Sequence, residues 1–148
     1  LPKTDMSRPD FRYIDHVSDS IVEAYGHTLC EAFEQSARAL TNIMCDLSRV
    51  NPQTSINIKA SGFDQKNLLY NWLEDVLLAL LVDNLVLAEF NIRLRKYKGE
   101  FRLHGICKGE LFSRHKHNYK VEVKAITYHE MKILHRRGKW TIRFLVDL

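Results

Sequence analysis

The pattern of apolar and polar residues predicts a helix that begins after Thr28 and runs to about Cys45. Apolar residues recur at intervals of three and four across this stretch, so one side of the helix would face the core. Thr28 can accept a hydrogen bond from a free amide of the first turn, and Glu31 can reach back, which together form a capping box. The expected buried positions are Leu29, Phe33, Ala37, Leu40 and Met44.

A second helix is predicted over residues of roughly 65–82, with Asp64 as its N-terminal cap. Its apolar stripe is unusually wide, so we expect it to be the more buried of the two helices. Trp72 lies within that stripe, and we expect it to fill the core rather than to act at the surface.

The remaining apolar residues lie in short runs that are typical of β-strands. Short polar or glycine-containing joints separate the later runs, which favours antiparallel pairing. Together these elements predict an α+β fold in which two main helices pack on a mostly antiparallel sheet. The expected strands cover residues 11–16, 20–26, 54–62, 86–97, 100–112, 119–128, 131–137 and 139–148.

Length and composition fit one globular domain. We expect residues 1–10, which contain two prolines and no pattern, to be a loose tail before a single domain over 11–148. The net charge of +4 permits an acidic or nucleic-acid partner without indicating one. Three widely spaced cysteines favour a reducing compartment, and no signal peptide or membrane-spanning run is visible. We therefore expect an intracellular protein, cytoplasmic or nuclear, that contacts no membrane.

Two acidic segments are candidates for binding a hard cation such as calcium or magnesium. DHVSD crowds Asp15, His16 and Asp19 into a turn, and Asp147 follows an apolar strand near the end of the sequence. Carboxylate oxygens are the ligands that such cations prefer. The alternative is structural, because aspartate is common in turns and acidic residues are common at frayed ends.

Histidines and one lysine supply further candidates. His115 and His117 would share one face of a strand, which could bind zinc, although SRHKHNYK also fits a basic loop that faces solvent or an acidic partner. Lys124 lies in an apolar run and, if the strand alternates, shares a face with Ile126 and Tyr128. Such a lysine either extends to the surface or pairs with a carboxylate, the obvious partners being Asp19, Asp147 and Glu110.

The sequence contains none of the Walker A, GxGxxG, GxSxG or HExxH motifs, and nothing in it forms a complete catalytic apparatus. Taken together, five segments resemble the archease family over Tyr13 to Leu148. Matching the family's order, they are DHVSD (DHTAD in the family), GHTLCEAFEQSA, LLYNWLEDVL, GELF with KHNYKVEVKAITYH, and WTIRFLVDL. The family fold is related to the strand-helix-strand-strand (SHS2) module.

The resemblance implies a function and a partner. Archeases are accessory proteins of the RtcB-type RNA ligase, which joins tRNA halves; they promote guanylylation of the ligase and multiple turnover. The chain is therefore expected to be an activator and not an enzyme, with the ligase complex as its partner. Contact with RNA would be indirect or weak, and no small-molecule substrate of its own is expected.

The resemblance also implies a metal site. The family's ligands fall on Asp19, Asp147 and an oxygen of Leu148, with a divalent cation, either calcium or magnesium or manganese. Supporting roles are implied for Asp15, His16, Glu110 and Lys124. The chain departs from the family pattern at four positions outside these ligands, which are Val17, Ser18, Ser113 and Lys116.

Two other function classes stay open. The first is a metal-dependent phosphoesterase or other hydrolase, in which His16 or Lys124 assists a cation held by the same aspartates. The second is an RNA-binding, chaperone-like domain, which the basic balance and SRHKHNYK suggest.

Overall fold

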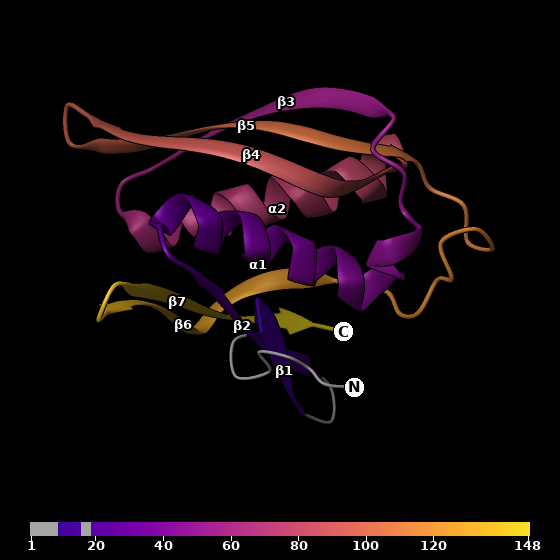
Figure 1. The fold of residues 1–148 in the computed structure, drawn as a ribbon, viewed down its shortest axis with the longest axis horizontal. Helices are drawn as coiled ribbons and strands as arrows, with labels where there is room; N and C mark the ends of the chain where they lie inside the picture. Colours follow the sequence, from indigo (N-terminus) through magenta and orange to yellow (C-terminus); the bar gives the residue numbers. More distant parts are fainter. Residues whose placement is uncertain (1–8, 16–18) are drawn as a thin grey trace.

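A computed structural model describes residues 9–15 and 19–148 of the chain, in which two helices lie between two antiparallel sheets (Figure 1). The helices are α1 (Leu29–Met44) and α2 (Gln65–Asp83), and a short 3-10 turn, η1 (Leu47–Arg49), follows α1. One sheet has the order β1 (Phe11–Asp15), β2 (Asp19–Gly26), β7 (Lys139–Asp147), β6 (Ala125–Arg136). The other has the order β3 (Thr54–Gly62), β5 (Glu100–Leu111), β4 (Leu85–Tyr97).

The predicted α+β class is confirmed, with the difference that the strands form two separate sheets. Figure 1 shows the three-stranded sheet above the helix layer and the four-stranded sheet below it. Each helix therefore buries side chains against both sheets, which explains why the apolar stripe of α2 is so wide.

Both predicted helix caps are present. Thr28 Oγ1 accepts a hydrogen bond from the Glu31 amide at 3.1 Å, and Glu31 Oε1 accepts one from the His27 amide at 2.9 Å. Asp64 Oδ1 accepts a hydrogen bond from the Asn67 amide at 2.7 Å. These bonds satisfy amides that have no partner within the helices, so each helix begins where its cap residue stands in the sequence.

Trp72 fills the core, as predicted. Its side chain is fully buried, and its Nε1 donates a hydrogen bond to the Phe33 carbonyl oxygen at 3.1 Å, which joins the two helices. Gly105 on β5 faces the ring, and a Cβ atom at that position would lie 3.2 Å from Trp72 Cζ3. The glycine therefore makes room for the indole.

The predicted strands over 119–128 and 131–137 are wrong in their boundaries. The structure has one strand, β6, whose register with β7 shifts between Thr127 and Lys132, while residues 119–124 lie outside any strand. These residues belong to a loop that packs against the end of α1. There the Lys120 amide donates to the Met44 carbonyl oxygen at 2.9 Å, so its backbone hydrogen bond goes to a helix and not to a neighbouring strand.

Most of the predicted tail, residues 1–8, lies outside the described residues. Asp10 is tied to the domain, because its carbonyl oxygen accepts a hydrogen bond from the Tyr25 amide at 2.8 Å. Burial raises the pKa of the Cys45 thiol to about 11 and that of the Cys107 thiol to about 12, so both act as small core residues. Among the described residues, no helix is long and apolar enough to cross a bilayer.

A candidate metal site where β2 begins and β7 ends

Asp19 is the first residue of β2, Asp147 is the last of β7, and the two are direct partners in the antiparallel register. Directly opposite residues project from the same face of a sheet, with Cβ atoms about 4.5–5.5 Å apart. Val22 and Phe144, which have the opposite parity, lie in the core, so both aspartates belong to the outer face of the sheet. Two carboxylates so placed repel each other and form an oxygen-rich site for a cation.

The two carboxylates differ in exposure. Asp19 is half-buried with its Oδ1 atom inaccessible to solvent, whereas Asp147 is exposed. The next residue, Leu148, is half-buried and packs its side chain against the core. The strand end is therefore anchored on one side and presents a carboxylate to solvent on the other.

The main chain of Asp147 is held from both neighbouring strands. Asp147 is paired with Asp19 on β2 and with Ala125 on β6, and the Lys124 amide donates a hydrogen bond to the Asp147 carbonyl oxygen at 2.8 Å. Lys124 itself is exposed and precedes β6, while Ile126 is buried. The expectation that Lys124 shares a strand face with Ile126 is therefore wrong, because the strand begins only at Ala125.

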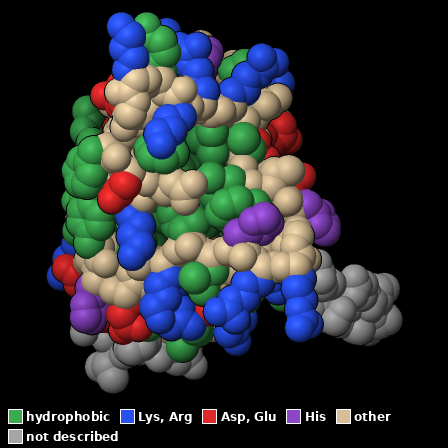
Figure 2. All heavy atoms as spheres, turned by 90° about the vertical axis from the view of Figure 1, so that its left-hand side faces the viewer, with side chains coloured by type: hydrophobic (Ala, Val, Ile, Leu, Met, Phe, Trp, Pro, Cys, Tyr) green, Lys and Arg blue, Asp and Glu red, His purple; other side chains and the backbone are tan. Residues whose placement is uncertain are grey.

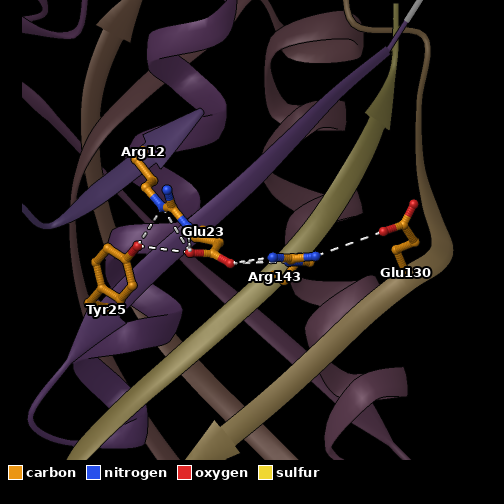
Figure 3. A network of polar contacts seen from close by, with 5 residues as sticks. All are labelled: Arg12, Glu23, Tyr25, Glu130 and Arg143. Carbon is orange, nitrogen blue, oxygen red and sulfur yellow. Dashed lines mark hydrogen bonds and ion pairs between the residues drawn. The ribbon is translucent and has the colours of Figure 1, made fainter. Parts of the chain in front are cut away.

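A network around Glu23 spans all four strands of the sheet (Figure 3). Glu23 on β2 accepts hydrogen bonds from Arg143 on β7 at 2.6 and 3.2 Å, from Arg12 on β1 at 2.9 Å and from the Tyr25 hydroxyl at 2.9 Å. Arg143 Nη1 also lies 3.8 Å from the Glu130 carboxylate on β6. Burial alone would raise the pKa of Glu23, but the hydrogen bonds from Arg143, Tyr25 and Arg12 outweigh it and lower this pKa to about 2.

This network fixes the register that pairs the two aspartates. Glu23 and Arg143 are direct partners, as are Asp19 and Asp147 two steps farther along the same pair of strands. A slip of one residue would turn one aspartate to the opposite face. Sequence reasoning missed this network, and the available signal was a charged residue in the middle of each of two apolar strands.

Glu110 lies apart from the aspartates, on β5 of the three-stranded sheet. It accepts hydrogen bonds from the Asn51 amide at 2.9 Å, from His117 Nε2 at 2.8 Å and from Lys116 Nζ at 2.7 Å. The Asn51 amide, then His117 and then Lys116, lower the pKa of Glu110 to about 2. The salt-bridge partner of Glu110 is therefore Lys116, and not Lys124 as the sequence suggested.

The predicted histidine pair does not share a face. His117 is fully buried, whereas His115 is exposed, because the segment turns here instead of forming a strand. His117 Nδ1 accepts a hydrogen bond from the Ser113 amide at 3.0 Å, so the ring proton lies on Nε2 and is donated to Glu110. His117 therefore anchors the loop internally, which corrects both the zinc interpretation and the expectation of a fully solvent-facing basic loop.

Two departures from the family pattern have local roles in this loop. Ser113 Oγ accepts a hydrogen bond from the Lys116 amide at 3.3 Å, and Lys116 forms the ion pair with Glu110. Both side chains thus help to hold the loop against β5.

Among the sequence candidates, the structure brings together Asp19, Asp147 and Leu148. Asp15 ends β1 opposite Ser20, and His16 lies outside the described residues. Over residues 9–15 and 19–148, no group of three or more His, Cys, Asp or Glu side chains is placed to hold a metal ion. Two carboxylates and a main-chain oxygen suit an oxygen-preferring cation that completes its shell with water or with groups of a partner.

Comparison with known proteins identifies relatives of the whole domain. Residues 11–148 match the archease protein family (MTH1598/TM1083). The chain is 36% identical over 138 residues to the protein archease of Sulfurisphaera tokodaii, covering 93% of this chain and 98% of the relative. It is 35% identical over 139 residues to that of Pyrococcus furiosus, with the same coverage of 93% and 98%.

Solved structures agree with this match. The solution structure of Methanobacterium thermoautotrophicum protein 1598 superimposes with a TM-score of 0.83 at 31% identity, covering 94% of this chain and 99% of that one. The crystal structure of an archease from Thermotoga maritima, described as a possible chaperone, has a TM-score of 0.54 at 17% identity, which supports the fold alone. It covers 99% of this chain and 100% of the other.

Proposed function

This chain belongs to the archease family, and from that membership we propose that it is a non-catalytic activator of an RtcB-type RNA ligase that acts in tRNA splicing. The observation that carries this proposal is the direct pairing of Asp19 with Asp147 at the edge of the domain. An accessory protein needs a chemically distinctive group that a partner can reach, and the exposed Asp147 carboxylate meets that need. The protein would then act where tRNA halves are joined, in the nucleus or the cytosol.

We further propose that Asp19, Asp147 and a main-chain oxygen of Leu148 hold a divalent cation, either calcium or magnesium or manganese. When bound, such a cation supplies positive charge that can offset the charge of the nucleotide phosphates during guanylylation of the ligase. Asp19 is the anchored ligand, because it is half-buried, and Asp147 is the ligand that faces the partner. The Glu23 and Arg143 pair keeps both on one face of the sheet.

The absence of a catalytic role follows from the state of the reactive side chains within the described residues. Burial raises the pKa of all three cysteine thiols, which disfavours the nucleophilic thiolate. His117 has both ring nitrogens engaged inside the protein. The chemistry is therefore assigned to the ligase, with this protein supplying acidic ligands.

A guanylylation assay tests this function. The ligase is incubated with labelled GTP alone, with the wild-type protein, with Asp147→Asn and with Asp83→Asn. Asp83 is an exposed aspartate at the end of α2 and gives the same change of charge elsewhere. We expect the wild type and Asp83→Asn to accelerate labelling of the ligase and Asp147→Asn to fail. No acceleration by the wild type would contradict the activator function, whereas acceleration by Asp147→Asn would contradict only the acidic site.

A further inference from the structure

The outer face of the three-stranded sheet carries a dense group of cationic side chains. Lys59 on β3, His104 on β5 and Arg93 on β4 are cross-strand partners and form one row across the sheet. In the adjacent row, Arg102 on β5 pairs directly with Arg95 on β4. The two rows lie about 7 Å apart along the strands, since each strand rises about 3.4 Å per residue.

These side chains line a groove of about 880 Å³. Among the residues that line it, Lys59, Arg93, Arg95 and Arg102 carry a permanent positive charge, and Glu100 is the sole carboxylate. Glu100 is already engaged, because its Oε1 atom lies 2.8 Å from Arg102 Nε. The groove is therefore strongly positive, although the whole chain has a net charge of only +4.

This arrangement is unfavourable for the sheet by itself. Like charges directly opposite each other destabilise a pair of strands, and Arg95 with Arg102 is such a pair. A bound polyanion would relieve the repulsion. Arginine in particular offers a planar fork of donors that matches phosphate oxygens.

An aromatic ring lies at the end of the groove. Tyr97 is 44% exposed at the end of β4, and the guanidinium groups of Arg102 and Arg95 lie 4.7 and 5.8 Å from the centre of its ring. The adjacent β4–β5 turn projects from the domain at the left of Figure 1. Figure 2 views that end and shows Lys and Arg side chains gathered along its top, over the three-stranded sheet.

We propose that this groove binds the phosphodiester backbone of RNA without reading its bases. Two rows of cations fit a chain of phosphates better than a single phosphate, and an exposed tyrosine beside arginines offers a surface on which a base can stack. A concave groove also disfavours a flat membrane surface as the occupant. The groove lies in the sheet opposite to that of Asp19 and Asp147, so one molecule could hold RNA on one side and contact the ligase with the other.

The phosphate-binding surface is independent of the proposed function, but the choice of RNA over DNA rests on it. The test measures fluorescence anisotropy of labelled oligouridine and oligothymidine with the purified full chain, over a series of potassium chloride concentrations. We expect binding that weakens as salt rises, because phosphate contacts release counterions. Arg93→Gln/Arg95→Gln should lower the magnitude of the salt slope by about 2, at about 1 for each cation removed.

Lys132→Gln/Arg136→Gln is the matched control, since it removes two exposed cations from β6 of the other sheet. We expect this variant to keep the wild-type slope and affinity for oligouridine. The proposal is overturned if the wild type does not bind, if both double variants weaken binding equally, or if inorganic phosphate or anionic vesicles compete as well as RNA does. Tighter binding of oligothymidine would overturn the choice of RNA.

The guanylylation assay separates this proposal from the function above. Arg93→Gln/Arg95→Gln should still stimulate labelling of the ligase, because that step involves no RNA, whereas Asp147→Asn should still bind oligouridine. Loss of RNA binding together with intact stimulation would therefore reject the groove alone. A thermal melt confirms beforehand that each double variant is folded.

Discussion

Glu23 accepts two hydrogen bonds from Arg143, its direct cross-strand partner, at 2.6 and 3.2 Å. Glu23 is 9% exposed, so the pair is largely withdrawn from solvent, and Arg12 completes its set of donors. Removal of one member would leave the others without a matching charge. The pair therefore links the stability of the four-stranded sheet to the position of Asp147.

Glu23→Gln should lower the free energy of unfolding by about 1.5–3 kcal/mol, which is the usual value for hydrogen bonds to a charged group. The measurement is urea unfolding at neutral pH. Glu89→Gln, an exposed change on β4, serves as the control and should alter stability little. Equal effects of the two substitutions would show that the network is not stabilising.

The stability contributed by Glu23 should depend on pH. Hydrogen bonds lower the pKa of Glu23 to about 2 in the folded protein, from an ordinary value of 4.5. Its contribution is therefore fully present above about pH 4.5 and is lost as the pH falls towards 2. The difference in unfolding free energy between the wild type and Glu23→Gln should shrink over this range, and a constant difference would contradict the account.

Asp147→Asn should have opposite effects with and without a cation. In a chelator, the variant should be more stable than the wild type by about 0.2–1 kcal/mol, because the repulsion from Asp19 is removed. Calcium, magnesium or manganese should raise the melting temperature of the wild type and leave that of the variant unchanged. If none of the three cations shifts the wild type, these aspartates do not form a cation site.

Gly105→Ala should destabilise the core by about 1–3 kcal/mol, because the added methyl group would lie 3.2 Å from Trp72 Cζ3. Phenylalanine lacks the outer indole atoms that this methyl group meets. The same glycine substitution should therefore cost less in a Trp72→Phe background, with a coupling energy of at least about 0.5 kcal/mol. Additive effects in the four-protein unfolding cycle would exclude the contact as the cause.

Local sequence patterns predicted the helices well, because their capping residues and periodic apolar positions act within one turn. Thr28 and Asp64 cap as expected, and Trp72 is buried. The pairing of Asp19 with Asp147 was beyond local reasoning, since these residues lie at opposite ends of the domain sequence. The family resemblance, and not the spacing of residues, singled them out.

The loop before β6 shows why the remaining features were missed. His117 lies in a polar run, which normally indicates a solvent-facing segment, yet it is fully buried against Glu110. That burial depends on a chain reversal that brings residues 113–117 over β5, and no periodic pattern encodes it. The Glu23 network likewise forms only when four strands assemble.

The central claim is that the exposed carboxylate of Asp147 is what the protein offers to the ligase. The most direct test is multiple-turnover ligation of tRNA halves by the cognate RtcB-type ligase, with the wild type, Asp147→Ala or Asp83→Ala added in substoichiometric and equal amounts. We expect stimulation by the wild type and Asp83→Ala and none by Asp147→Ala. Equal stimulation by all three proteins would contradict the claim.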